Sequence, residues 1–196
     1  LQAFNPRGKV RLVRYRERVP LFSRHGVEEQ VESIFKRTVP LPSGGSIVID
    51  PTEALTAVDV NSGRTRSGHP EDMYLQANLE AAREVARQLR LRDIGGLIVV
   101  DFIDMRSSKN QKAVEKALRD AVKVDRARVD IGRISRNGLL EVNRQRIGTP
   151  LALRTHRACP TCGGSGKIPS PETVSVNLLR RIEERAAIGG IGGVRV

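Results

Sequence analysis

An unbroken aliphatic run, Leu97–Val100, ends at a carboxylate, Asp101, and leaves this segment few ways to fold. Four consecutive aliphatic residues between a Gly-Gly pair and a charge predict a strand buried on both faces, as in sheets covered by helices. Ligands of open α/β sheets gather at the carboxyl ends of such strands. Asp101 is therefore a candidate ligand-binding residue, although an Asp at this position can also simply cap the turn or helix that follows.

A second strand is predicted around Asp59, and it also ends in polar residues. The two-residue period of a strand places Ala57, Asp59 and Asn61 on one face and the two valines between them on the other. A buried carboxylate is costly unless a positive charge neutralises it, and oxygen ligands without nearby His or Cys suit Mg²⁺ or Mn²⁺. Capping is the simpler interpretation of either Asp alone, but the pair, with Asn61 beside Asp59, favours a metal site.

The order of the predicted elements indicates the fold class. Hydrophobic periodicity predicts helices over 27–35, 75–89, 108–124 and 172–187, and strands over 9–16, 39–41, 46–50, 55–61, 96–102 and 127–134. The segment 139–146 fits either a short helix or a strand, and the Pro-Ser-Gly-Gly sequence at 42–45 predicts the turn of a hairpin. Strands that alternate with helices in this way predict a layered α/β sheet.

The chain carries a strong positive charge. Its formal net charge is +12 and its pI is about 10.7, which favours a nucleic-acid partner, with a surplus of surface lysine as the simpler alternative. Aromatic residues make up only 3% of the chain, so contact with a phosphate backbone is expected to dominate over base stacking. The sequence has no membrane-spanning apolar stretch and two cysteines, which predicts a cytoplasmic protein; its start at Leu1 predicts a fragment.

Five basic residues follow one side of the helix predicted after Asp101. They are spaced by three and four residues: Lys109, Lys112, Lys116, Arg119 and Lys123. A row of this kind is usually a solvated face, here balanced in part by acidic neighbours. Because the row begins a few residues after Asp101, a phosphate backbone that leads to the metal site is the alternative interpretation.

The two cysteines form a short knuckle, Cys159-Pro-Thr-Cys162-Gly-Gly-Ser-Gly. Glycines after the second thiol let the backbone turn toward a metal, as in structural Zn²⁺ sites; a redox pair is the alternative, but no thioredoxin-like strand precedes it. A tetrahedral Zn²⁺ needs four ligands, and His156 is a candidate third without an obvious fourth. The simplest completion is a second copy of the knuckle, so that one Zn²⁺ joins two chains.

Segments along nearly the whole chain resemble the ribonuclease E/G family, in the family's order. They are 42–50 (Pro-Ser-Gly-Gly-Ser-Ile-Val-Ile-Asp), 53–63 (Glu-Ala-Leu-Thr-Ala-Val-Asp-Val-Asn-Ser-Gly), 78–82 (Asn-Leu-Glu-Ala-Ala), 87–93 (Arg-Gln-Leu-Arg-Leu-Arg-Asp), 95–105 (Gly-Gly-Leu-Ile-Val-Val-Asp-Phe-Ile-Asp-Met), 125–128 (Asp-Arg-Ala-Arg), 134–141 (Ile-Ser-Arg-Asn-Gly-Leu-Leu-Glu) and 159–162 (Cys-Pro-Thr-Cys). The resemblance implies four parts: the end of an RNase H-like subdomain (1–35), a DNase I-like catalytic subdomain (36–155), a zinc-link (156–168) and the start of a small dimerisation domain (169–196).

The resemblance also implies roles for the residues at the two strand ends. By motif, Asp59 and Asp101 would bind the catalytic Mg²⁺, and Asn61 would orient Asp59 or the scissile phosphate. Asp104 lies in the same motif and is expected to support the ligands without binding the metal itself. Together these residues would cut single-stranded, A/U-rich RNA.

Further roles concern assembly and RNA binding. Cys159 and Cys162 would be the thiolates of a Zn²⁺ shared between two subunits, in a dimer or a dimer of dimers. Arg128 matches an arginine placed near the family's 5′-phosphate pocket. With Lys109, Lys112 and Lys116 it completes the residues expected to contact RNA.

The expected function is therefore Mg²⁺-dependent endonucleolytic cleavage of single-stranded RNA in RNA processing and decay. Both the mRNA-degrading E-type and the rRNA-trimming G-type enzyme fit this expectation. We expect a cytoplasmic location, with a peripheral position at the inner membrane as an alternative for a full-length protein. A zinc-linked, basic RNA-binding module without catalysis is the alternative of a different class. The carboxylates argue against it, because a pure phosphate binder gains nothing from negative charges that face RNA.

Overall fold

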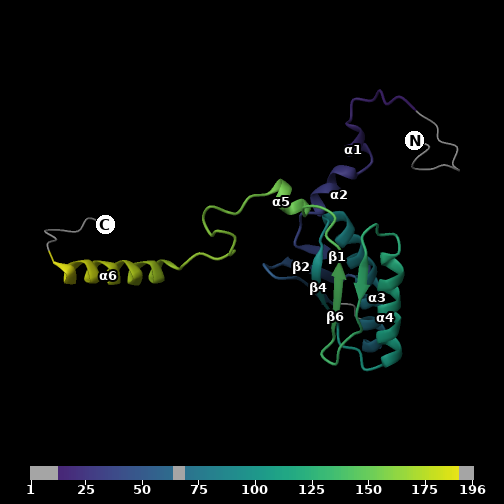
Figure 1. Ribbon diagram of the computed structural model, residues 1–196. Helices are drawn as coiled ribbons and strands as arrows, with labels where there is room; N and C mark the ends of the chain where they lie inside the picture. The colour runs from purple at the N-terminus through teal and green to yellow at the C-terminus, as the bar shows by residue number, and fades with distance from the viewer. Residues whose placement is uncertain (1–12, 64–68, 190–196) are drawn as a thin grey trace. The chain divides into compact units, whose positions relative to one another are not determined.

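A computed structural model describes residues 13–63 and 69–189 of the chain. The chain divides into two units, Leu1–Arg154 and Thr155–Val196, which are described separately. The first unit is built around a sheet with helices packed against it (Figure 1). Within the described ranges, no helix has both the length and the apolar character needed to cross a membrane.

The sheet of the first unit places the two polar strands side by side. Among the described residues it has six strands in the order β1-β2-β3-β4-β6-β5. β3 and β4 run parallel, and the other neighbouring strands run antiparallel. The bounds are β1 (Thr38–Pro40), β2 (Ser46–Pro51), β3 (Thr56–Asn61), β4 (Gly96–Asp101), β5 (Val129–Ile131) and β6 (Leu139–Arg144). The predicted layered α/β fold is confirmed, as is the hairpin formed by β1 and β2.

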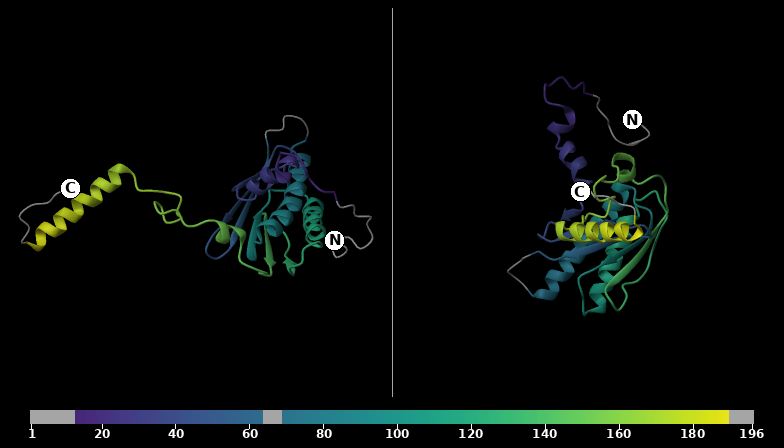
Figure 2. Two further views of the ribbon diagram at one scale, coloured as in Figure 1. Left: turned by 90° about the horizontal axis from the view of Figure 1, so that it is seen from above. Right: turned by 90° about the vertical axis from the view of Figure 1, so that its left-hand side faces the viewer.

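Two long helices, α3 (Pro70–Arg92) and α4 (Ser108–Val122), lie side by side on one face of this sheet (Figures 1 and 2). Pro at the first position of α3 and two acidic residues in its first turn favour the start of a helix there. Half of its buried residues are alanines, which let the helix axis approach the sheet and α4 closely.

The two faces of the sheet differ in burial. Ile98 and Val100 of β4 are fully buried and belong to one core with residues of α3 and α4. Leu97, on the opposite face, is 42% exposed. The prediction that the run Leu97–Val100 is buried on both faces is therefore wrong, because α3 and α4 pack on the same face of the sheet.

A buried arginine links the end of strand β6 to the C-terminal ends of the two long helices. Arg144, at the end of β6, is 3% exposed, and its Nε donates to Asp125 Oδ2 at 2.8 Å. Its Nη1 donates to Asp93 Oδ1 at 3.1 Å and to the carbonyl of Ile94 at 2.9 Å. Asp93 ends α3 and Asp125 lies in the turn after α4, so one guanidinium joins three elements.

Several smaller elements differ from the predictions. Of the strand predicted over 9–16, residues 13–16 form no strand, and residues 9–12 lie outside the described part of the chain. The periodic segment at 27–35 begins as a helix, α2 (Val27–Ser33), after the short α1 (Leu21–Arg24). The ambiguous segment 139–146 contains the strand β6, β5 is shorter than predicted, and α5 (Leu151–Thr155) was not predicted.

The second unit consists of the cysteine knuckle and a helix, α6 (Pro171–Ile188), which confirms the helix predicted over 172–187. The side chain of Ser170 caps the helix by accepting the N–H of Thr173 at 3.3 Å. The described residues of α6 include no buried side chain, and Val174, Leu178 and Leu179 are exposed.

Candidate active site

The parallel pairing of β3 and β4 brings the two predicted carboxylates together. In the register of these strands, Asp59 lies directly beside Asp101, and neighbouring strands are about 4.8 Å apart. Both side chains are exposed, whereas Val58, Val60 and Val100, next to them in the strands, are buried. Asp59 and Asp101 therefore occupy the sheet face opposite to α3 and α4.

Asn61 lies on the same face and contacts Asp59 directly. Its Nδ2 donates to Asp59 Oδ2 at 2.7 Å. This contact fixes one oxygen of the carboxylate and leaves the carbonyl oxygen of the amide available for a ligand. The structure thus places Asp59, Asn61 and Asp101 together, as the strand periods predict.

The site has an excess of negative charge. The pKa of Asp101 is raised, first by partial burial and then by the neighbouring carboxylates of Asp59 and Asp104. Arg37 is a cation near Asp59, but its guanidinium is paired with Asp50 of β2. A cation bound between Asp59 and Asp101 would relieve the repulsion between them.

The loop between Asp101 and α4 is held by several contacts. Both the N–H and the C=O of Ile103 bond to the side chain of Asn78, a fully buried residue of α3. The N–H of Phe102 donates to the carbonyl of Gly138 at 3.4 Å, and the side chain of Gln111 donates to the carbonyl of Met105 at 2.9 Å. Asp104, in this loop, is exposed near Asp101.

Asn78 and Gly138 were not predicted as site residues from the sequence. A signal for Asn78 was its position among the apolar residues Leu75, Leu79 and Ala82 of the helix, where an amide needs a partner. The Asn-Gly pair that ends at Gly138 was a turn signal. Neither signal identifies the atoms that these residues contact.

The residues at this site fit a hard divalent cation. Within the described ranges, no group of three or more His, Cys, Asp or Glu side chains is arranged to hold a metal ion. Mg²⁺ nevertheless suits two adjacent carboxylates, because it usually binds proteins through one or two carboxylates and takes its other ligands from water and substrate phosphates. Asp59 and Asp101 are the residues that would hold it.

The cysteine knuckle in the second unit has a compact backbone. The N–H of Gly163 donates to the carbonyl of Cys159 at 2.8 Å, and the glycines at 163, 164 and 166 all have positive φ. The pKa of Cys159 is lowered by N–H groups of Cys162 and Thr161 that donate to its sulfur, which favours the thiolate that metals bind. His156 does not join the cysteines in a three-residue group; its Nδ1 lies 2.8 Å from Thr155 Oγ1.

The predicted RNA-binding residues are not beside the carboxylates. Lys109, Lys112 and Lys116 are exposed on α4, which packs on the opposite face of the sheet. Arg128 precedes β5 at the end of the sheet where Arg144 pairs with Gly96, far from Asp101. It is 81% exposed, with Asp130 3.6 Å away. The predicted RNA-binding residues therefore lie away from Asp59 and Asp101: the three lysines lie on the other side of the sheet, and Arg128 lies at its opposite end.

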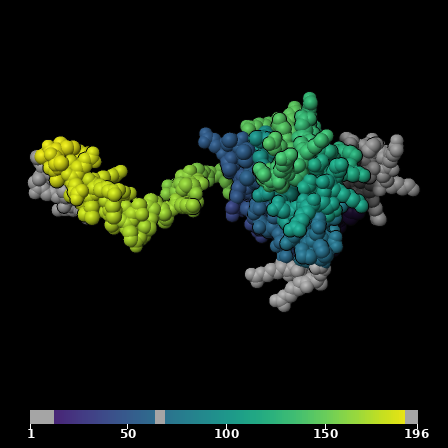
Figure 3. All heavy atoms as spheres, turned by 90° about the horizontal axis from the view of Figure 1, so that it is seen from below, coloured from purple at the N-terminus to yellow at the C-terminus, as the bar shows by residue number. Residues whose placement is uncertain are grey.

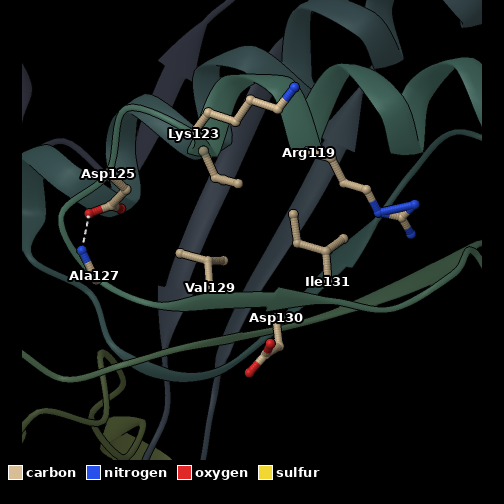
Figure 4. Close-up of a pocket in the computed structure, with 8 residues that line it drawn as sticks. Arg119, Lys123, Asp125, Ala127, Val129, Asp130 and Ile131 are labelled. Atoms are coloured by element: carbon tan, nitrogen blue, oxygen red, sulfur yellow. Dashed lines mark hydrogen bonds between the residues drawn. The ribbon is translucent and has the colours of Figure 1, made fainter.

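A separate pocket of about 440 Å³ lies between α4 and β5. Figure 4 shows Val129 and Ile131 pointing toward the helix and Asp130 pointing away from it, with Arg119 and Lys123 above. Neither Asp59 nor Asp101 lines this pocket. This pocket is therefore not the site of the predicted chemistry.

Comparisons with known proteins agree on one family. The chain is 57% identical to ribonuclease E of Haemophilus influenzae over 173 residues, which are 88% of this chain and 18% of that protein. It is 41% identical over 167 residues to a chloroplastic ribonuclease E/G-like protein of Arabidopsis thaliana, covering 84% of this chain and 17% of that protein. It is 38% identical over 174 residues to ribonuclease G of Escherichia coli, covering 88% of this chain and 35% of that protein.

The chain thus spans less than a fifth of the length of these ribonuclease E relatives. The model of the Ribonuclease E/G family matches residues 1–147, a range that includes both carboxylate strands and the loop after Asp101. With three-quarters of its residues matched and a relative at 57% identity, the chain belongs to the ribonuclease E/G family.

Proposed function

We propose that this chain is the catalytic part of a Mg²⁺-dependent endoribonuclease that hydrolyses phosphodiester bonds of single-stranded RNA. The observation that carries the proposal is the pairing of Asp59 beside Asp101 on the uncovered face of a parallel strand pair. The names of the relatives, ribonuclease E and ribonuclease G, support the same reaction class. A non-catalytic RNA-binding module does not explain two adjacent carboxylates in a chain with a net charge of +12.

Each residue of the site has a distinct role in this proposal. Asp59 and Asp101 hold the cation, and Asn61 keeps the Asp59 carboxylate in place through its 2.7 Å hydrogen bond. The second amide hydrogen of Asn61 is free to donate to an oxygen of the scissile phosphate. When bound, Mg²⁺ offsets negative charge on the phosphate and makes the attacking water easier to deprotonate.

The substrate is proposed from charge and from the geometry of the open face. Asp59 and Asp101 are accessible without displacement of a helix, so an extended phosphodiester can approach them. The basic surface elsewhere on the chain attracts a polyanion and keeps it near the site.

The test is cleavage of a 5′-monophosphorylated, single-stranded oligonucleotide as Mg²⁺ is increased. Asp59→Asn and Asp101→Asn should each lower the cleavage rate at limiting Mg²⁺ by 100-fold or more, on the order of the loss of 3 kcal/mol of transition-state stabilisation. RNA affinity should not fall, since each substitution removes a negative charge that repels RNA. Full activity of both variants would contradict the metal assignment.

A matched control for these variants lies on the neighbouring strand. Glu141 of β6 is an exposed carboxylate on the same sheet face, paired in register with Val99 two residues before Asp101. Glu141→Gln changes the charge of this face by the same amount without touching the pair. It should leave the Mg²⁺ requirement unchanged.

We also propose that Cys159 and Cys162 bind Zn²⁺ together with the same two residues of a second chain. Two thiolates fill half of a tetrahedral shell, and the hydrogen bonds to the Cys159 sulfur favour its thiolate form. The exposed apolar side chains of α6 offer further surface for such a pairing. Assembly would then be separate from the chemistry at Asp59 and Asp101.

A further inference from the structure

We propose that Asn78 is a positioning residue for the carboxylate site: its buried amide fixes the backbone of the loop that follows Asp101 and carries Asp104. This inference rests on the proposed function, because it assigns to Asn78 a role in the Mg²⁺ site. Asn78 lies on α3, on the helix side of the sheet, and so acts on the site through the loop.

The contact is a pair of hydrogen bonds from one side chain to one residue of the loop. Asn78 Nδ2 donates to the carbonyl of Ile103 at 2.8 Å, and the N–H of Ile103 donates to Asn78 Oδ1 at 3.0 Å. Asn78 is fully buried. A buried backbone group without a partner is strongly unfavourable, so the peptide groups on both sides of Ile103 are confined to one orientation.

The position of Ile103 makes this restraint relevant to the metal site. Ile103 stands between Asp101, the last residue of β4, and Asp104. Rotation of the backbone at Ile103 would move Asp104, and the chain just after Asp101, relative to Asp59 and Asp101, which are held by the pairing of β3, β4 and β6. Mg²⁺ demands nearly ideal octahedral geometry, so its affinity depends on where these oxygens lie.

A glycine confines the loop from the other side. Gly138 has a φ of +79°, and its carbonyl accepts the N–H of Phe102. A Cβ at this position would lie 3.2 Å from Asp104 Oδ1, 3.3 Å from the carbonyl of Phe102 and 3.8 Å from Asp101 Oδ1. The turn before β6 therefore lies close to the carboxylates of Asp104 and Asp101, with no room for a side chain at position 138.

The test is the substitution Asn78→Ala in the full chain, with Mn²⁺ as the probe of metal binding by electron paramagnetic resonance and Mg²⁺ as the cofactor in cleavage. Loss of a group that orients metal ligands typically costs about 10- to 100-fold in metal affinity or activity. We expect the Mn²⁺ dissociation constant and the Mg²⁺ concentration for half-maximal cleavage to rise by this factor. The rate at saturating Mg²⁺ should recover toward that of the unsubstituted chain. Exchange of the Ile103 N–H with solvent deuterium should speed up.

A matched control separates positioning from general destabilisation. Gln88 is also a buried polar residue of α3, but it bonds to Glu84 and Arg92 and not to the loop. Gln88→Ala should destabilise the helix without raising the Mg²⁺ requirement. Asn78→Asp keeps an acceptor for the Ile103 N–H but loses the donor to the Ile103 carbonyl, and should also raise the Mg²⁺ requirement.

A second variant keeps the proposal testable should Asn78→Ala fail to fold. Asn78→Asp is that variant, and Gly138→Ala, which places a Cβ within 4 Å of Asp104 and Asp101, should also raise the Mg²⁺ requirement. Gly26→Ala introduces a Cβ at a similar positive φ with nothing within 4 Å, and should not. Cleavage by folded Asn78→Asp and Gly138→Ala with an unchanged Mg²⁺ requirement would overturn the role of Asn78 alone. No metal-dependent cleavage by the unsubstituted chain would overturn the proposed function itself.

Discussion

The α4 lysine row, which we define as Lys109, Lys112 and Lys116, offers a quantitative test of RNA binding. Among the described residues, none of these three side chains forms a hydrogen bond or an ion pair, whereas Lys123 is paired with Asp120 at 2.6 Å and Arg119 with Glu115 at 3.5 Å. All three side chains are exposed, so the row is accessible to a polyanion; Figure 3 draws one face of the surface of the chain. We predict that these three charges contact phosphates of bound RNA.

The magnitude follows from counterion release. Each contact between a cation and a single-stranded phosphate contributes about 0.7 to the slope of log affinity against log salt. Changing all three lysines to Gln should therefore reduce the slope by about 2, so that the loss of affinity between about 50 and 200 mM salt becomes about 16-fold smaller. Fluorescence anisotropy of a labelled oligonucleotide, measured without Mg²⁺ to prevent cleavage, gives this slope directly.

The paired cations of the same helix provide the control. Arg119→Gln with Lys123→Gln removes two charges that acidic neighbours already balance. This double variant should change the slope by less than half as much as the triple variant. An unchanged slope in the triple variant would refute the reasoning and return the lysine row to its simpler interpretation as a solvated face.

Further predictions concern stability and zinc. Arg144→Met should lower the free energy of unfolding by about 3–5 kcal/mol in urea, because Asp125 would keep a buried charge without its partner; a loss no larger than that of an exposed ion pair, about 1 kcal/mol, would contradict this. Burial raises the pKa of Asp125, but hydrogen bonds from Arg144 and from the N–H of Ala127 outweigh it and lower the pKa overall. Its contribution to stability is therefore complete above the unfolded pKa of about 3.9 and is lost as the pH falls through the lower folded value. Arg144→Met should lose this part of the acid dependence. Metal analysis should find about half a Zn²⁺ per chain, and Cys159→Ser with Cys162→Ser should remove it and yield a smaller assembly; one Zn²⁺ per chain would contradict sharing between two chains.

The pairing of the two carboxylates could be predicted from the sequence because it depends on local rules. A strand with Asp59 near its end, a helix of 23 residues and a strand ending in Asp101 form a crossover that makes the two strands parallel. In parallel neighbours the carboxyl ends meet at the same edge. The strand period then places Asn61 beside Asp59, which the 2.7 Å contact shows.

The support of the site could not be predicted because its partners are distant in the sequence and belong to the backbone. The partner of Asn78 is the peptide group of Ile103, 25 residues away, and no side-chain pattern encodes that contact. The same holds for Arg144, whose partners Asp93 and Asp125 come from two different helix ends. The short helices α1 and α5 were not predicted, since four or five residues carry too little periodicity, and β5 is shorter than the strand predicted over 127–134.

The sequence alone did not show which face of the sheet the helices cover. This determines whether the carboxylates are buried or accessible. A two-residue period separates two faces without saying which one the helices cover. α3 and α4 pack on the face of Val58 and Val100, so both carboxylates remain on the accessible face. Because the helices cover this face, Leu97 is exposed on the other face, and the α4 lysine row lies on the helix side of the sheet. Under the proposed function, the part of the RNA strand that reaches Asp59 and Asp101 is therefore different from the part that contacts the lysine row. The salt slope and the Mg²⁺ requirement should then vary independently among the variants described above.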